Sequence, residues 1–212
     1  MRQKSIESAL ENANPIVAEY FLSTELADAL KENVAYGDIV SMIDNSSKFD
    51  EIIQKELNKR WDEDLTGLFG EETYIPETKI SGGRTREAET GYRINTEYLG
   101  TIGIDPSKVL FFRVTQPSET PKPESYWTSD YFETIKGLRR EISPEKRENS
   151  IVLVTSLETI NQNQGLIQDI NDDSGLAVRQ IGTGPFEQSK AITYIKPDYE
   201  AVLGSFGDCF GE

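Results

Sequence analysis

The spacing of the apolar residues changes near residue 70 of this 212-residue chain, and this change limits the fold more than any other feature. Before it, apolar residues recur with the α-helical period of about 3.6 residues. After it, they gather in short runs with the composition of β-strands, most clearly over 109–115 and 151–154. The pattern predicts an α+β protein in which a helical region, residues 1–70, packs on a mixed, mainly antiparallel β-core, residues 71–212, with one or two helices. The two regions form either one domain or a core with a helical extension.

Three helices are expected in the first region. Asn14 is a good N-cap and Pro15 suits the first helical position, so one helix is predicted to run from there to residue 30. Gly37 is expected to open a shorter helical piece. A third helix is predicted to begin at Ser47, with Asp50 completing an approximate capping box. It would carry five large apolar residues on one face: Phe49, Ile52, Ile53, Leu57 and Trp61.

The second region reads as strands joined by turns and short helices. Alternation over 91–99 predicts a half-buried strand, and the apolar run 109–115 follows a turn at 105–107. A proline-rich connector, 117–123, leads to a helix expected over 131–142. The clearest buried strand, 151–154, is followed by a short helix, and a last strand is expected over 190–195.

The chain contains no histidine and a single cysteine, Cys209. These absences exclude a Ser-His-Asp or Cys-His nucleophile, a histidine-ligated zinc site and a cysteine-rich zinc cluster. Residues 169–175 offer oxygen atoms at alternate positions, but Ser174 and Gln180 stand where a calcium loop needs glycine and glutamate, so a solvated turn is expected and no metal. Chemistry, where present, must use carboxylates, hydroxyls and arginines.

The formal net charge is −15, and it is unevenly distributed. Residues 1–70 and 151–212 carry net charges of −7 and −6, whereas residues 71–150 carry −2. Such a surface argues against nonspecific nucleic-acid binding and against anionic membranes, because both require clustered Lys and Arg. With no signal peptide or membrane span in the sequence, a cytoplasmic protein is expected.

Arg113 lies inside an apolar run, Thr-Ser pairs occur near two later elements, and Glu187 precedes a predicted strand. This order over residues 90–200 resembles the Arg, Ser/Thr and Glu series of mono-ADP-ribosyltransferases. Two Thr-Ser pairs fit the middle element, Thr128 with Ser129 and Thr155 with Ser156.

The resemblance implies NAD as co-substrate and a protein or nucleic acid as acceptor. Arg113 would bind the phosphates of NAD, Trp127 would offer an aromatic surface to the nicotinamide, and Glu187 would hold the ribose. Arg93 could replace Arg113, which would suit the spacing to Thr128. The chain departs from the family in having no Ser-Thr-Ser triplet, and Pro185 stands where arginine-modifying members have a second acidic residue.

Two other classes of function remain open. One is a non-catalytic acidic interaction or inhibitor protein, a decoy that binds a basic protein surface in place of nucleic acid. The other is a hydrolase that uses two carboxylates, which must lie roughly 5–9 Å apart.

Overall fold

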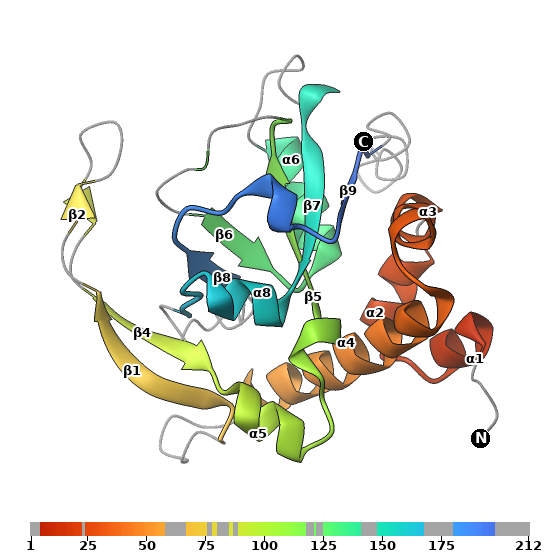
Figure 1. Cartoon of the computed structure of the whole chain (residues 1–212), viewed down its shortest axis with the longest axis horizontal. Helices are drawn as coiled ribbons and strands as arrows, with labels where there is room; N and C mark the ends of the chain where they lie inside the picture. The colour runs from red at the N-terminus through yellow and green to blue at the C-terminus, as the bar shows by residue number, and fades with distance from the viewer. Residues whose placement is uncertain are drawn as a thin grey trace, which may run out of the picture.

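The computed structural model describes residues 5–22, 24–57, 67–75, 78–79, 85–86, 89–117, 121, 125–140, 148–167 and 180–197. Four helices come first in the chain: α1 (Ile6–Glu11), α2 (Pro15–Phe21), α3 (Thr24–Asn33) and α4 (Tyr36–Leu57). Antiparallel sheets with a few helices follow, so the protein is α+β as predicted (Figure 1). Trp61, Cys209 and the turn over 169–175 lie outside the described residues.

The helix predicted from Asn14 to residue 30 is two helices. Asn14 caps α2 as expected, with its Oδ1 accepting a hydrogen bond from the backbone N–H of Ile16 at 3.0 Å. α2 ends at Phe21, and α3 begins at Thr24. Phe21 and Leu26 are five residues apart, a spacing that would turn them to different sides of one continuous helix. The break lets both side chains reach the same core.

The two helices predicted around residues 37 and 47 are instead one, α4. Ser47 does not begin a helix; its Oγ accepts a hydrogen bond from the backbone N–H of Asn14. Its polar neighbours also bind other segments: Asn45 Oδ1 accepts from the Asp105 N–H at 2.7 Å, and Ser46 Oγ accepts from the Leu110 N–H at 3.2 Å. These buried residues resemble a helix start in sequence, but they fasten the middle of α4 to the rest of the fold.

The main sheet has five strands in the order β8-β6-β5-β7-β9, and its described pairs are antiparallel. Both apolar runs predicted as strands form β5 (Leu110–Thr115) and β7 (Ile151–Ser156). The remaining strands are β6 (Ser125–Thr128), β8 (Gln180–Thr183) and β9 (Thr193–Ile195). β9 is shorter than the strand expected over 190–195, because the 3₁₀ turn η2 (Gln188–Lys190) precedes it.

A second pair of strands, β1 (Phe69–Ile75) and β4 (Glu89–Ile94), extends beyond β8. Residues 166 and 167 join the two sheets, since Leu166 pairs with Gly182 of β8 and Ile167 pairs with Tyr92 of β4. The strand predicted over 91–99 is wrong in its second half. Asn95 ends β4 by capping helix α5 (Thr96–Thr101), because its Oδ1 accepts from the Tyr98 N–H at 3.1 Å. A smaller pair consists of β2 (Thr78–Lys79) and β3 (Thr85–Arg86).

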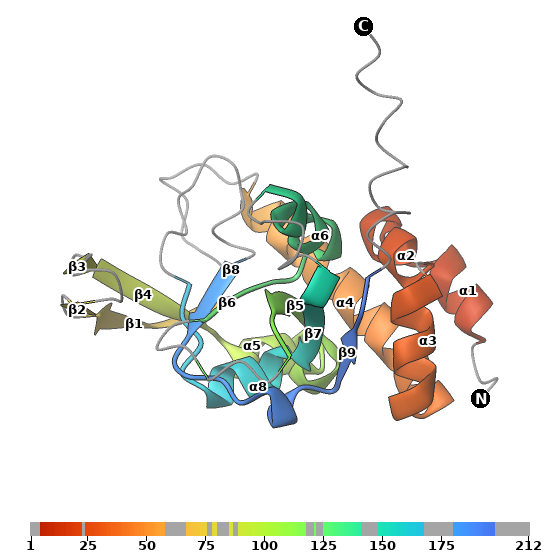
Figure 2. The same cartoon turned by 90° about the horizontal axis from the view of Figure 1, so that it is seen from above.

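Alternation along β5 divides the core into two clusters. Leu110 and Phe112 face the first cluster, which includes residues of α1–α4 and of α6 (Tyr131–Arg140). Phe111 faces the second cluster, which contains Leu157 and Ile160 of α8 (Leu157–Gln162). Figure 2 shows α6 on one side of the sheet and α8 on the other. α4 contributes to both clusters, so it connects the helical region to both faces.

Tyr20 of α2 connects the helices to the centre of the sheet. Its ring lies 5.4 Å from the ring of Phe112 and 6.2 Å from that of Tyr131, measured between centroids. Burial raises the pKa of Tyr20, so its hydroxyl stays neutral inside the first cluster. At the edge of the sheet, Asn33 of α3 donates from Nδ2 to Thr193 Oγ1 of β9 at 3.0 Å.

The segment between α8 and the bridge to β8 is tightly packed, and two Gly→Ala variants test this. A Cβ at Gly165 would lie 2.5 Å from Ile160 Cγ2 and 3.0 Å from the Ile160 carbonyl oxygen, whereas a Cβ at Gly100 of α5 would meet no atom within 4 Å. We expect Gly165→Ala to lower the free energy of unfolding by about 1–3 kcal/mol. Gly100→Ala should raise it by up to about 1 kcal/mol, as alanine favours helices. Urea unfolding followed by circular dichroism measures both, and equal effects would contradict the packing described.

Candidate active site

Arg113 and Trp127 meet across the central pair of strands. Phe112 of β5 pairs with Thr128 of β6, so the next pair in this antiparallel register is Arg113 with Trp127. The guanidinium carbon lies 5.9 Å from the centre of the indole ring, within the range of a cation–π contact. Arg113 is half-buried and Trp127 is fully buried. This contact stabilises a positive charge within an otherwise apolar strand.

A hydrogen bond and an aromatic contact also hold the Trp127 side chain in place. Its Nε1–H donates to Thr183 Oγ1 of β8 at 3.2 Å, and that hydroxyl donates in turn to the Ser125 carbonyl oxygen at 3.3 Å. The ring of Phe186 lies 4.5 Å from the indole, edge to face. The hydrogen bond and the aromatic contact hold the indole in place. The indole is therefore a rigid surface for the Arg113 guanidinium.

Residues 184–192, the crossover segment, connect the two edge strands β8 and β9 by passing over this face of the sheet (Figure 1). Phe186 packs on Trp127, and Gln188 Nε2 donates to the Gln116 carbonyl oxygen at 2.7 Å, just beyond β5. Farther along, the Ile192 N–H donates to the Val154 carbonyl oxygen of β7 at 2.8 Å. The crossover segment therefore contacts β6, the residue just beyond β5, and β7 in turn.

Glu187 lies in the crossover segment, directly after Phe186. Its side chain is exposed, and it occupies the N-cap position of η2 without making a capping hydrogen bond. The carboxylate therefore faces solvent beside the residue that covers Trp127.

Thr155 and Ser156 have different surroundings. Thr155 pairs with Phe111, so its side chain shares the sheet face of Arg113. It is fully buried, and its Oγ1 has no hydrogen-bond partner among the described residues. Ser156 instead caps α8, because its Oγ accepts from the Thr159 N–H at 3.2 Å. Only Thr155 of this pair offers a hydroxyl to the Arg113 face.

Thr128, Ser129 and Arg93 lie elsewhere. Thr128 pairs with Phe112 and shares its face, and its Oγ1 accepts from the Asp130 N–H at 3.0 Å in the turn that starts α6. Half-buried Ser129 belongs to the same turn. Arg93 is exposed on β4, and residues 166–167, β8 and β6 separate that strand from β5. The structure thus groups Arg113, Trp127 and Thr155 on one face, with Glu187 in the segment above it.

Sequence reasoning missed Ser125 and Thr183. The two residues pair across β6 and β8 and share the face of Trp127, which lies two residues after Ser125. Ser125 is almost fully buried, and its Oγ has no hydrogen-bond partner among the described residues. Alternation from Trp127 would have indicated Ser125, had residues 125–128 been recognised as a strand.

The described part of the chain contains neither a cluster of metal-binding side chains nor a membrane-spanning helix. No group of three or more cysteine, aspartate or glutamate side chains that could hold a metal ion occurs there. Nor is any helix in those residues both long and apolar enough to cross a bilayer. Comparisons with protein-family models, with curated proteins and with solved structures find no match for this chain.

Two Thr→Val variants test the hydrogen bonding on the Arg113 face. Thr155→Val keeps the shape and removes a buried hydroxyl without a partner, so the free energy of unfolding should rise by about 1 kcal/mol. Thr183→Val leaves the buried indole N–H of Trp127 unpaired and should lower the same quantity by about 1–3 kcal/mol. Urea unfolding measures both changes. A loss of stability in Thr155→Val equal to that in Thr183→Val would show that the Thr155 hydroxyl has a partner.

Proposed function

We propose that this protein transfers ADP-ribose from NAD to a protein or nucleic-acid acceptor, with Arg113 and Glu187 in its active site. The observation that carries the proposal is the contact of the Arg113 guanidinium with Trp127 on the face crossed by the segment that holds Glu187. A guanidinium held on a rigid ring is suited to bind a pyrophosphate through two parallel hydrogen bonds. An exposed carboxylate on the segment that crosses this face is suited to stabilise positive charge on a ribose.

The reaction requires little proton transfer, which suits a chain without histidine. The bond between the ribose C1′ and the nicotinamide nitrogen breaks, and nicotinamide leaves with the electron pair of that bond. Positive charge develops on the ribose, and the Glu187 carboxylate stabilises it. A nucleophile of the acceptor then forms the new bond at C1′ and releases its proton to solvent.

The remaining residues have supporting roles in this proposal. Trp127 is fully buried, so we assign it to the positioning of Arg113 rather than to direct stacking on nicotinamide. Of the two Thr-Ser pairs, residues 155–156 supply the hydroxyl on the Arg113 face, so we assign the supporting hydroxyl to Thr155. Ser156, Thr128 and Ser129 are better explained by the helix starts where they lie.

Substitution of Glu187 tests the catalytic part of the proposal. We expect Glu187→Gln to lower the rate of NAD consumption by about 10²- to 10³-fold, because the amide lacks the charge that stabilises the transition state. The midpoint of thermal unfolding should not change, since the side chain is exposed. Nicotinamide release measures the rate, and Glu51→Gln, an exposed carboxylate on α4, is the matched control. NAD consumption near the wild-type rate in Glu187→Gln would remove the assignment.

Substitution of the two arginines decides which one binds NAD. Arg113→Ala should weaken NAD binding by about 10- to 100-fold, the value of hydrogen bonds to a charged group, while Arg93→Ala should leave it unchanged. Calorimetric titration with NAD measures both, on variants shown by circular dichroism to be folded. Arg113→Lys should also weaken binding, because lysine keeps the charge but loses the planar fork. The opposite ranking would assign the site to Arg93, and no effect of either would contradict the proposal.

A further inference from the structure

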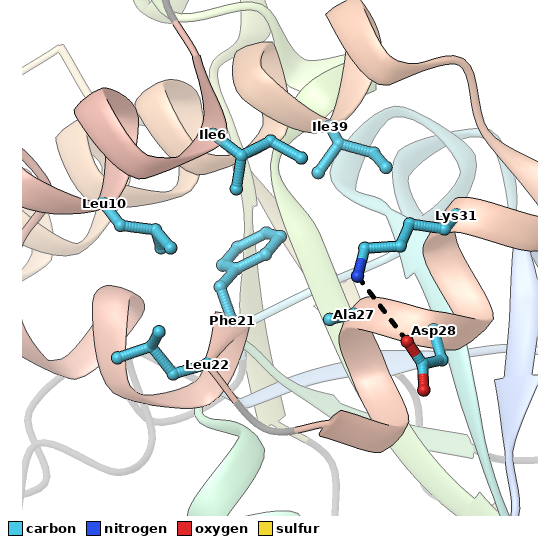
Figure 3. A pocket seen from close by; sticks show the side chains of 8 residues that line it. All are labelled: Ile6, Leu10, Phe21, Leu22, Ala27, Asp28, Lys31 and Ile39. Atoms are coloured by element: carbon cyan, nitrogen blue, oxygen red, sulfur yellow. Dashed lines mark ion pairs between the residues drawn. The ribbon is translucent and has the colours of Figure 1, made fainter.

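A pocket of about 270 Å³ opens between the four N-terminal helices, far from Arg113 in the sequence (Figure 3). Its apolar walls include Leu10 of α1, Phe21 of α2 and Ile39 of α4. Phe21 and Ile39 are buried and belong to the first cluster. An apolar cavity of about 150 Å³ can hold a benzene ring, so this pocket has room for one large apolar side chain.

An exposed apolar residue borders the pocket. Leu22, at the C-cap of α2, also lines it, and 67% of its surface is exposed. Covering this side chain would remove apolar surface from water, which favours binding of an apolar partner group.

The helices that form the pocket are strongly acidic. Residues 5–33 contain six carboxylates and one cation, Lys31. Five of the carboxylates are exposed: Glu7, Glu11, Glu19, Asp28 and Glu32. Lys31 lines the pocket and lies 3.6 Å from Asp28, but both side chains are more than half exposed, so this pair is weak. The net negative charge of these helices favours basic polypeptides over nucleic acid as ligands.

We infer that this surface binds a basic polypeptide segment of a partner protein. One large apolar side chain of the segment enters the pocket and covers Leu22, while neighbouring Lys or Arg residues lie against the carboxylates of α1–α3. Apolar contact at the centre with charges around it is the common arrangement of a protein interface. None of the residues assigned to NAD belongs to this surface, so polypeptide binding does not depend on ADP-ribosyl transfer.

The test uses a fluorescein-labelled, 15-residue amphipathic peptide of leucine and lysine, titrated with the full chain and followed by fluorescence anisotropy. A peptide with the leucines replaced by alanine and one with the lysines replaced by glutamate are the peptide controls. We expect the leucine–lysine peptide to bind at least about tenfold more tightly than either, because the surface offers both an apolar pocket and negative charge.

Matched protein variants separate this surface from the general charge of the protein. The quadruple variant Glu7→Gln, Glu11→Gln, Asp28→Asn, Glu32→Gln should weaken binding about tenfold, since four surface pairs are lost. A second quadruple variant removes the same charge at exposed residues elsewhere: Glu51→Gln, Glu71→Gln, Glu72→Gln and Glu97→Gln. It should change affinity less than about twofold, because salt screens distant charges.

Leu22→Ala tests the apolar part of the surface, and Ile102→Ala, at the end of α5 and 38% exposed, is its control. Leu22→Ala should weaken binding at least about threefold and Ile102→Ala should not. The inference would be overturned if the two quadruple variants lost the same affinity, or if the two alanine variants did. Equal affinity for a control peptide would also overturn it.

Failure of the leucine–lysine peptide to bind would overturn it as well. That outcome includes the case in which Leu22 mediates self-association, which sedimentation would detect.

Discussion

Burial of β5 on both of its faces is the constraint on which the rest of the structure depends. Leu110 and Phe112 point into the first cluster and Phe111 into the second, so both sides of the central strand must be covered. The N-terminal helices and α6 cover one side. α8, α5 and the crossover segment cover the other, and α4 reaches both. A charge in such a strand needs a defined partner, and Arg113 has the face of Trp127.

Polar groups that cost stability gather on the same side of the sheet as Arg113. Thr155 and Ser125 are buried there, and neither hydroxyl has a hydrogen-bond partner among the described residues. Proteins tolerate such local costs most often at functional sites. On the helical side, Leu22 is exposed beside an apolar pocket that Asp28 and Lys31 also line. The buried hydroxyls and the apolar pocket lie in two separate regions of the protein, and we propose a different ligand for each.

Much of the fold followed from the sequence because long apolar runs and helical periodicity report burial directly. The strands β5 and β7 and the helix α6 were predicted in this way. α4 was divided wrongly, because buried Ser47 is indistinguishable in sequence from an exposed N-cap. The pairing of Arg113 with Trp127 could not be predicted, since it depends on the register of β5 with β6, a strand of four residues after a proline-rich connector. The choice between Thr128 and Thr155 likewise required knowing which face each residue occupies.

The most direct test of the central claim is the fluorescence of Trp127 during a titration with NAD. Trp61 is the other tryptophan of the sequence, so a Trp61→Phe variant leaves Trp127 as the sole tryptophan. A pyrophosphate bound by the Arg113 guanidinium places negative charge close to the indole and should produce a saturable change in its emission. ATP, at equal concentration, controls for nonspecific anion binding. A saturable change specific to NAD, lost in Arg113→Ala, is the predicted result. Unchanged emission at millimolar NAD would contradict the proposed site.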